Sequence, residues 1–510
     1  MSIQELPADY LDDQNETEPR EECGVFGVWA PGEEVSKLTY FGLFSLQHRG
    51  QEGAGIAVGD GDRIVVFKES GLVSQVFDES ILSALSGHVA IGHTRYSTAG
   101  AGSWDNVQPM FRTAPDGTDV ALGHNGNLLN YTELLERAVD KGLIKPNAKV
   151  SGQGSSSDTA VMAALLAGGV DEGRSVIDSA RQLLPTLTGA FCLTFTDGNT
   201  LYAARDPHGV RPLVLGRLEK GWVVASETCA LDIVGASFVR EIEPGELITI
   251  DETGVNSERF AETTHRGCVF EYVYLARPDS TIRGRNVNAV RIDIGRRLAR
   301  DFPADGDLVI PVPESGTPAA VGYARESGIP FAQGLMKNAY VGRTFIQPSQ
   351  TLRQLGIRLK LNPVREVIEG KRLIVVDDSI VRGNTQRALI RMLREAGAAE
   401  IHVRIASPPV KWPCFYGIDF ASPGELIANI GGSDGESVTE SIRRAIGADS
   451  LGFVSTEEMI AASEQPGEEL CAACFTGEYP LGLPDNNHNA DAVRRIQATS
   501  VPAAAAAPKE

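Results

Sequence analysis

Several features that define whole classes of proteins are missing from this chain of 510 residues. No apolar run approaches the roughly 20 residues that a membrane-spanning helix needs. The first 22 residues have neither the basic start nor the apolar stretch of a secretory signal. We find no internal repeat of the kind that builds solenoids. These absences predict a soluble, cytoplasmic, globular protein without a membrane partner.

Positive charge is also scarce. The chain has 47 Lys and Arg residues against 67 Asp and Glu residues, which gives a net charge of -20. Nucleic acid affinity comes mainly from Lys and Arg on phosphates, so the composition argues against a nucleic acid partner. The same excess of negative charge argues against binding to an anionic membrane surface.

Cysteine is sparse, with seven residues in the whole chain. An odd count, in a chain long enough to bury sizeable cores, does not favour a disulfide framework. Metal binding, catalysis and burial remain as roles. Cys192 and Cys229 stand in the strings AFCLTF and ETCALD, which predict packing in a core.

Three changes in composition and in the predicted order of strands and helices divide the chain. Residues 1–22 hold eight acidic groups and one Arg, which predicts a mobile leader. Short strands flanked by helices then predict an α+β domain over 23–260. Over 261–480, buried strands at 307–312, 371–376 and 400–406 alternate with helices at 317–326 and 384–396, which predicts an α/β domain with a parallel sheet. Residues 481–510 are expected to form a loose tail.

The string LIVVDDSIVRGNT, residues 373–385, has the most specific pattern. A buried strand ends in Asp377 and Asp378, at the sheet edge where ligands of parallel sheets bind. The following turn offers the hydroxyls of Ser379 and Thr385 and the backbone N–H groups of a helix start, which suit a phosphate. Gly383 allows close backbone approach. The carboxylates would repel phosphate, so sugar hydroxyls or Mg²⁺ fit them better.

A second loop, PVPESGTPAA at residues 311–320, follows another predicted strand. Its Ser315 and Gly316 stand where a diphosphate or Mg²⁺ could bind. Between the two loops lies a local excess of basic residues, which usually marks a solvated face. Its place between two phosphate candidates favours an anion-binding lid instead. The basic residues are Lys337, Arg343, Arg353, Arg358 and Lys360.

Cys23 opens the ordered part of the chain with CGVFGV. Removal of the leader would give it a free α-amino group with a pKa of roughly 7.7–8.0, suited to act as general base for the adjacent thiol. An internal Cys in a strand is more often a small core residue. Arg95 offers a partner for a carboxylate, and Asp158 offers one for an ammonium group. Asn125 and Gly126 provide an amide and a flexible N–H of the kind that builds an oxyanion hole.

Family resemblance sharpens both hypotheses. Residues 373–385 resemble the signature of type I phosphoribosyltransferases, which bind phosphoribosyl pyrophosphate (PRPP) through ribose hydroxyls on the paired acids. The strings SLQHRGQEGAGIA, HTRYST, GHNGNL and SSSDTA resemble the N-terminal-nucleophile glutamine amidotransferases, whose fold is an αββα sandwich. This second resemblance implies that Cys23 is the nucleophile, that Arg95 and Asp158 hold glutamine, and that Asn125 and Gly126 stabilise the oxyanion.

The first resemblance implies the remaining assignments. PRPP contacts fall on Asp377, Asp378, Ser379, Arg382, Gly383, Asn384, Thr385, Lys337 and Lys360, and contacts with one Mg²⁺ per subunit fall on Ser315, Asp377 and Asp378.

Together the two halves resemble the family of glutamine PRPP amidotransferases over about residues 23–480. That resemblance implies the first committed step of purine synthesis, inhibition by purine nucleotides, a homotetramer and internal transfer of ammonia.

Four cysteines remain to be assigned. Cys471 and Cys474 form C-x-x-C, which by itself is ambiguous among zinc, iron–sulfur and redox use. One branch of the resembled family has both a cleaved leader and a [4Fe–4S] cluster. The resemblance therefore implies one cluster per subunit on Cys268, Cys414, Cys471 and Cys474, with a structural or oxygen-sensing role.

Two alternatives stay open at this stage. Another amidotransferase with the same nucleophile, such as a glucosamine-6-phosphate or asparagine synthase, would lack a DDSIVRGNT string in its acceptor domain. A non-catalytic PRPP-sensing regulator would need neither Cys23, nor Asn125 and Gly126, nor a leader.

Overall fold

The computed structural model describes residues 23–96, 104–145, 157–171, 173–338, 360–418, 420, 422–429, 436–485 and 487–500. The predicted leader lies outside the described residues. Within these ranges, no helix is both long enough and apolar enough to cross a membrane.

Contacts divide the chain into two compact units, and the chain crosses between them more than once. The N-terminal unit combines Arg20–Val290 with Trp412–Pro423 and Ile460–Glu510, and the C-terminal unit is built from Arg291–Lys411 and Gly424–Met459. This division differs from the expected boundaries at 260 and 480, because later segments return to pack with the N-terminal unit. A helix, α16 (His488–Ser500), also occupies part of the expected loose tail.

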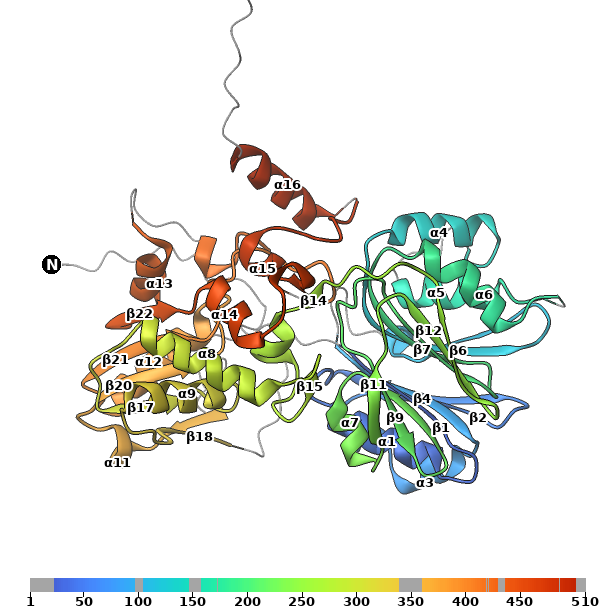
Figure 1. Cartoon of the computed structure of the whole chain (residues 1–510), viewed down its shortest axis with the longest axis horizontal. Coiled ribbons are helices and arrows are strands. Elements are labelled where there is room, and N and C mark those ends of the chain that lie inside the picture. Colours follow the sequence, from blue (N-terminus) through green and yellow to red (C-terminus); the bar gives the residue numbers. More distant parts are fainter. Residues whose placement is uncertain are drawn as a thin grey trace, which may run out of the picture. The chain divides into compact units, whose positions relative to one another are not determined.

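Two antiparallel sheets form the centre of the N-terminal unit (Figure 1). In spatial order, the first contains β11 (Ser237–Glu241), β9 (Val214–Leu218), β10 (Gly221–Ala225), β1 (Gly24–Trp29), β4 (Val89–Arg95), β2 (Gly53–Gly59) and β3 (Ile64–Ser70). The second contains β13 (Gly254–Arg259), β12 (Glu246–Asp251), β8 (Leu201–Arg205), β7 (Gly189–Thr196), β6 (Asp119–Leu128) and β5 (Met110–Thr113).

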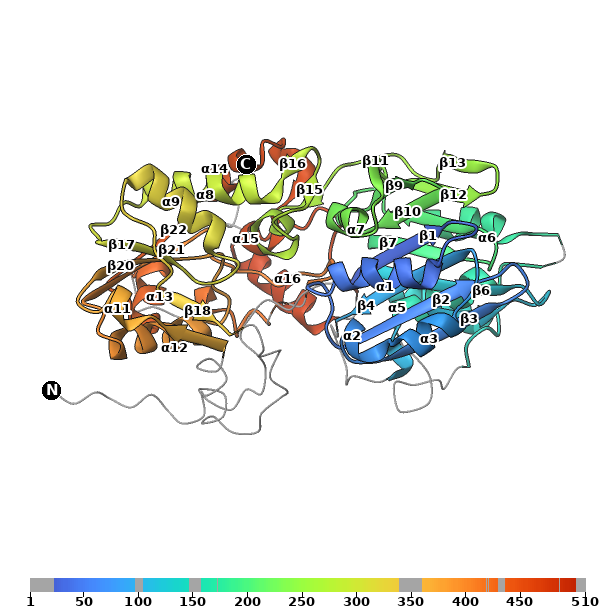
Figure 2. The same ribbon diagram turned by 90° about the horizontal axis from the view of Figure 1, so that it is seen from below.

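Helices cover the outer face of each sheet, as Figures 1 and 2 show. The first sheet packs on α1 (Val35–Ser45), α2 (Val73–Val76), α3 (Glu79–Ala84) and α7 (Thr228–Ile233). The second packs on α4 (Tyr131–Asp140), α5 (Asp158–Ala167) and α6 (Val176–Leu183). A third core, with Val25, Ile91 and Ala121 among its members, fills the space between the sheets. The predicted αββα sandwich is confirmed.

Short elements join the later segments to this sandwich. The strand β14 (Gly267–Cys268) pairs in parallel with β23 (Leu470–Cys471), so that Cys268 lies opposite Cys471. A π-helical turn covers Glu271–Leu275, and β15 (Thr281–Ile282) pairs with β16 (Arg285–Asn286). The helix α15 (Ala473–Thr476) follows directly after β23.

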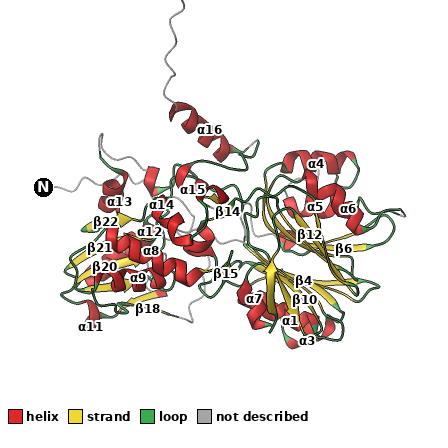
Figure 3. Cartoon of the chain, viewed as in Figure 1, coloured by secondary structure: helices red, strands yellow, loops and turns green. Residues whose placement is uncertain are grey.

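The C-terminal unit is built on a parallel sheet, as the alternating pattern predicts (Figure 3). Its strands, in spatial order, are β17 (Leu308–Pro311), β20 (Arg372–Asp377), β21 (Glu400–Ile405) and β22 (Ser450–Phe453). A two-stranded ladder joins β18 (Leu335–Lys337) and β19 (Leu361–Pro363). Among the described residues, its helices are α9 (Thr317–Ser327), α11 (Arg365–Ile368), α12 (Asn384–Glu395) and α13 (Val438–Ile446), with the greater part of α8 (Val287–Asp301) and the first half of α14 (Thr456–Ser463).

Candidate functional site

Cys23 stands immediately before β1, at one end of the first sheet. Because Gly24 pairs with Thr94 in the antiparallel ladder, Cys23 lies alongside Arg95. Side chains alternate along a strand, and Val25 and Ile91 both belong to the core between the sheets. Cys23 and Arg95 therefore face the same inter-sheet space. Burial lowers the pKa of the Arg95 guanidinium, and the negative charge of a Cys23 thiolate opposes that shift.

β6 brings Asn125 to this space from the second sheet. Ala121 belongs to the inter-sheet core, so Gly123 and Asn125 face the same way. Asn125 is buried, and among the described residues its Nδ2 has no hydrogen-bond partner. A buried amide without an acceptor costs free energy, so this amide is suited to receive a negatively charged oxygen. The space between the two sheets thus receives a thiol and a cation from one sheet and an amide donor from the other.

Gly126 follows Asn125 in a conformation that favours glycine. Its φ is +144°, and a Cβ at this position would lie 2.0 Å from the carbonyl oxygen of Ala190. Any other side chain would have to displace the neighbouring strand. The sequence predicts a flexible backbone at Gly126; in the structure, only glycine fits at this position.

Asp158 is the first residue of α5, and its side chain is bound to the end of β6. Its carboxylate accepts hydrogen bonds from the backbone N–H groups of Leu128 (3.2 Å) and Thr159 (2.8 Å), and lies 3.7 Å from Nδ1 of His124. Burial opposes ionisation, but the nearby imidazole of His124 and these hydrogen bonds outweigh it and hold the pKa of Asp158 below its usual value. Asp158 is therefore a stable anion at the end of β6 that carries Gly126.

Two histidines that the sequence analysis did not single out stiffen this region. His93 Nε2 lies 3.0 Å from the carbonyl oxygen of His124, which links β4 of one sheet to β6 of the other. Burial lowers the pKa of His93 to about 3, so the ring stays neutral. The sequence gives no sign of this contact, because it depends on how β4 and β6 of the two sheets pack together.

In the C-terminal unit, the paired acids lie where the sequence predicts, at the carboxyl end of β20. Asp377 and Asp378 are both buried. Asp377 accepts a hydrogen bond from the side chain of Gln386 on α12, and the Ser379 hydroxyl donates to Asp378 at 2.6 Å. Burial raises the pKa of Asp378, although hydrogen bonds from Ser315 and Ser379 act against it. A bound cation or sugar hydroxyls would relieve the cost of burying this charge.

The following turn forms the start of α12. Asn384 and Thr385 are the first two residues of this helix, and Gly383 precedes them with a φ of +78°. A Cβ on Gly383 would lie 2.3 Å from Cδ1 of Ile427. Arg382 is paired with Glu425 at 3.1 Å. The helix start supplies the N–H groups that the sequence analysis expects to hold a phosphate.

The second predicted loop contacts the first. A Cβ on Gly316 would lie 2.5 Å from the carbonyl oxygen of Val376 and 3.1 Å from Cα of Asp377. Ser315 forms a hydrogen bond with Asp378 that helps to hold that carboxylate ionised. The structure therefore brings Ser315, Asp377 and Asp378 together at one sheet edge. Their oxygens are the donors that Mg²⁺ prefers.

The predicted lid is described only at its base. Lys337 closes β18, and its Nζ lies 3.5 Å from a carboxylate oxygen of Glu314 in the second loop. The carbonyl oxygen of Lys360 accepts a hydrogen bond from the N–H of Asn338 at 2.9 Å. Lys337 thus belongs to the two-stranded ladder beside the site, and Lys360 directly precedes it. Arg343, Arg353 and Arg358 lie outside the described residues.

The remaining four candidate cysteines line one cavity in the N-terminal unit. Its wall also includes Arg211, Tyr416 and Tyr479. Burial and the nearby Cys414 raise the pKa of Cys471 to about 12. Burial together with the other three thiols holds the pKa of Cys474 well above its usual value. The four thiols that share this cavity are Cys268, Cys414, Cys471 and Cys474.

These thiols fit a soft, multinuclear metal group by donor type and by convergence. Among the described residues, no three His, Cys, Asp or Glu side chains form a group that could hold a single metal ion. In a [4Fe–4S] cluster each iron takes one thiolate, so the four sulfurs surround the group instead of meeting at one point.

A buried charge network, absent from the sequence predictions, supports the Cys23 region. Arg49 donates hydrogen bonds to Glu227 and to both carboxylate oxygens of Glu271, at 3.2 and 2.6 Å for the latter. Glu271 also lies 3.6 Å from the guanidinium of Arg211. A Cβ on Gly50 would lie 2.6 Å from the backbone of Thr94, so the network is packed directly behind the Cys23–Arg95 end of the sheet.

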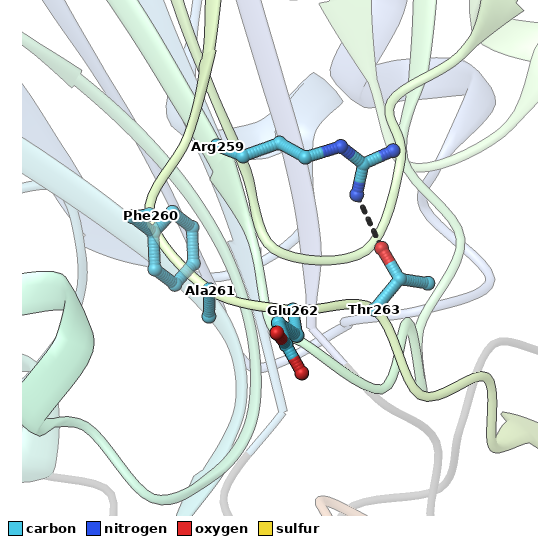
Figure 4. Close-up of a pocket in the computed structure, with 5 residues that line it drawn as sticks. All are labelled: Arg259, Phe260, Ala261, Glu262 and Thr263. Atoms are coloured by element: carbon cyan, nitrogen blue, oxygen red, sulfur yellow. Dashed lines mark hydrogen bonds between the residues drawn. The ribbon is translucent and has the colours of Figure 1, made fainter.

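Two cysteines and one surface hollow have no part in these sites. Cys192 and Cys229 are buried in core clusters, as predicted. A surface hollow is formed by the consecutive residues Arg259–Thr263, where the Arg259 guanidinium donates to the Thr263 hydroxyl (Figure 4). It holds none of the predicted site residues.

Comparisons with known proteins agree with this geometry. A model of the glutamine amidotransferase domain matches residues 93–232, and a model of the phosphoribosyl transferase domain matches residues 288–407. The amidophosphoribosyltransferase of Mycobacterium tuberculosis is 69% identical over 472 residues, which cover 92% of this chain and 89% of the relative. That of Bacillus subtilis is 47% identical over 469 residues, or 91% and 95% of the two chains.

Two solved structures are similar over almost the whole chain. One is described as the allosteric regulatory enzyme of purine biosynthesis, and the other as glutamine PRPP amidotransferase from B. subtilis complexed with ADP and GMP. Each has a TM-score of 0.83 and 45% sequence identity over 92% of this chain, and covers 99% and 100% of its own length, respectively.

Proposed function

Because the chain belongs to the amidophosphoribosyltransferase family, we propose that its two units divide one reaction between them. The reaction transfers glutamine-derived ammonia to C1 of PRPP and gives 5-phosphoribosylamine, glutamate and pyrophosphate, in purine biosynthesis. The observation that carries the division is that Cys23, Arg95 and Asn125 face one space in the N-terminal unit, while Asp377 and Asp378 end a parallel strand in the other.

In the N-terminal unit, Cys23 attacks the side-chain amide of glutamine after the leader is removed. The freed α-amino group takes the thiol proton and returns it to the leaving ammonia. Arg95 pairs with the carboxylate of glutamine, and Asp158 holds its ammonium group. Nδ2 of Asn125 and the N–H of Gly126 stabilise the oxyanion of the tetrahedral intermediate. Water then hydrolyses the γ-glutamyl thioester.

In the C-terminal unit, Asp377 and Asp378 bind the ribose hydroxyls of PRPP. The turn from Ser379 to Thr385 holds the 5-phosphate at the start of α12. When bound, one Mg²⁺ at Ser315, Asp377 and Asp378 would neutralise charge on the leaving pyrophosphate. Lys337 and Lys360 contribute positive charge beside the phosphate groups of PRPP.

The experiment that tests this assignment is pyrophosphate release from PRPP with Mg²⁺, comparing no donor, glutamine and ammonium. We expect release only with a nitrogen donor, with glutamine effective at neutral pH. Release with ammonium but not with glutamine would show that the glutamine site is inactive while the PRPP site works. Absence of release with either donor, from protein with a cleaved leader and intact metal content, would contradict the proposed activity.

The oxyanion site gives a prediction of its own. Substitution of Asn125 by Ala should lower kcat for glutamine hydrolysis by about 10²–10³-fold, because one preorganised donor is lost. The KM for glutamine should change little, since the amide acts on the intermediate. Steady-state glutaminase kinetics measure both values. The substitution Asn127→Ala is not a suitable control, because Asn127 belongs to the same strand, two residues after Asn125. Asn199→Ala, at an exposed turn, is suitable. An unchanged kcat in Asn125→Ala would exclude this residue from the oxyanion site.

We propose that the cysteine cavity holds one [4Fe–4S] cluster. The convergence of four thiols on one cavity supports this proposal. Burial and the neighbouring thiols raise the pKa of Cys471 and of Cys474, and an iron–sulfur group would bind these sulfurs as thiolates. The reaction needs no electron transfer, so the cluster would have a structural or oxygen-sensing role. It would join β14, the Cys414 segment and β23.

Substitution of Cys471 by Ser should reduce iron and sulfide to less than one half of the unaltered content, because the cluster loses one of four thiolates. Iron analysis and visible absorbance of anaerobically purified protein measure this. Cys229→Ser is the matched control, because Cys229 is equally buried but lies beside Ser45 and Glu227. Full iron content in Cys471→Ser, or equal loss in the control, would contradict the assignment.

We propose three further properties on the same basis. Purine nucleotides act as feedback inhibitors, which the nucleotide-bound relative supports. The protein assembles as a homotetramer in the cytoplasm. Cleavage before Cys23 removes residues 1–22, because only a terminal Cys23 has the amine that the mechanism uses.

A further inference from the structure

The segment Trp412–Ile418 lies against the end of β6 in the N-terminal unit. Gly417 has a φ of +117°, and a Cβ on it would lie 3.3 Å from Cα and 3.4 Å from the carbonyl carbon of Gly126. The backbone of this segment therefore packs directly on the backbone of the proposed oxyanion residue. Nearly three hundred residues of chain separate the two.

Asn127, the next residue of β6, joins the segment by a hydrogen bond. Its Nδ2 donates to the carbonyl oxygen of Phe415 at 3.0 Å, and more weakly to that of Leu128 at 3.5 Å. Asn127 is half-buried, so water competes only in part for this bond. The side chain follows Gly126 directly, and its fixation limits how the Gly126 peptide can turn.

Other contacts hold the segment itself in place. The guanidinium of Arg211, which is fully buried, donates to the carbonyl oxygen of Tyr416 at 2.8 Å. The N–H of Trp412 donates to the carbonyl oxygen of Cys474 at 3.1 Å. The Tyr416 hydroxyl donates to the carbonyl oxygen of Gly482 at 2.9 Å. The segment is thus a fixed support on which Asn127 can act.

We propose that Asn127 is a positioning residue for the oxyanion site: by binding Phe415, it holds β6 against the segment Trp412–Ile418 and so orients the N–H of Gly126. This inference rests on the proposed glutaminase function of the N-terminal unit. Asn127 itself does not touch the reacting atoms. Asn127 acts by fixing the position of the Gly126 N–H, because displacement of such a donor by about 1 Å can lower the rate 10²-fold.

The test uses Asn127→Ala and Asn127→Asp in the full-length, leader-cleaved protein. The Asp variant keeps the shape but replaces the donor with an oxygen that repels the Phe415 carbonyl. Asn130→Ala is the matched control, because Asn130 also donates to a backbone carbonyl, that of Thr186 at 2.9 Å, away from the segment. Gly417→Ala is a second, independent variant that acts from the other side of the contact.

We expect kcat with glutamine to fall about tenfold or more in both Asn127 variants and in Gly417→Ala. The KM for glutamine, the ammonia-dependent rate, the iron content and the alkylation rate of Cys23 should stay within twofold, and Asn130→Ala should resemble the unaltered enzyme. Unchanged kcat in the Asn127 variants would overturn the inference. A joint fall of kcat, ammonia-dependent rate and iron content would also overturn it, by showing a general structural role. Absence of glutamine use in the unaltered enzyme would instead contradict the proposed function.

Discussion

Substitution of Cys23 by Ala should abolish glutamine-dependent pyrophosphate release, by on the order of 10³-fold or more, and leave ammonia-dependent release measurable. The reason is that Cys23 is the only nucleophile proposed for the amide, whereas free ammonia bypasses that step. The thiol stands beside Arg95 at the end of β1 and contributes to no core cluster, so its loss should not disturb the sandwich. Parallel assays with glutamine and ammonium chloride measure the two rates.

Two further variants sharpen this test. Cys23→Ser keeps the shape but has a weaker nucleophile, so it should also lose glutamine use. Cys229→Ser, which alters a buried thiol behind the first sheet, should keep both activities. Retained glutamine use in Cys23→Ala would eliminate Cys23 as the nucleophile. Loss of both activities in Cys23→Ala would mean that the residue has a structural role.

Substitution of Asp377 or Asp378 by Ala should lower turnover with both nitrogen donors, by about 10²-fold or more, because both donors require PRPP to be held in the C-terminal unit. Asp377 and Asp378 are buried at the carboxyl end of β20, where Ser315, Ser379 and Gln386 bind them. Glutamine hydrolysis at the other unit does not use these carboxylates. Pyrophosphate release measured with each donor, beside PRPP binding, tests this expectation.

Asp307→Asn provides the matched control for these acids. Asp307 binds Arg372, the first residue of β20, at 2.9 Å, so it lies at the opposite end of the same strand. Exposed ion pairs of this kind contribute little to stability because water screens them, and turnover should stay near normal. Ammonia-dependent turnover close to that of the unaltered enzyme in Asp377→Ala or Asp378→Ala would contradict the PRPP site.

The sequence predicts what depends on local pattern. Continuous apolar runs predict β17, β20 and β21, because strands buried on both faces of a parallel sheet need no polar alternation. Asp377 and Asp378 could be placed at a strand end for the same reason. The αββα architecture follows from family resemblance, since short alternating strands alone do not fix how two sheets pack.

Contacts between distant segments could not be predicted in this way. The hydrogen bond from Asn127 to Phe415 spans 288 residues, and that from Arg49 to Glu271 spans 222. The sequence around each of these residues does not predict which distant residue it contacts. The same holds for the division of the chain, because no composition change at residue 412 signals that the segment returns to the N-terminal unit.

The interleaved path of the chain has a consequence for its synthesis. A ribosome completes Val290 long before it reaches Cys471; at 5–20 residues per second, the interval is roughly ten to forty seconds. During that time the segment that binds Asn127 and Arg211 has not yet been synthesised. The strand that carries Cys471 and pairs with Cys268 is also still missing. The cysteine cavity is therefore finished only near the end of translation. Insertion of the proposed iron–sulfur group would therefore follow synthesis of almost the whole polypeptide, and a gene cut at residue 290 would yield an N-terminal unit without this cavity.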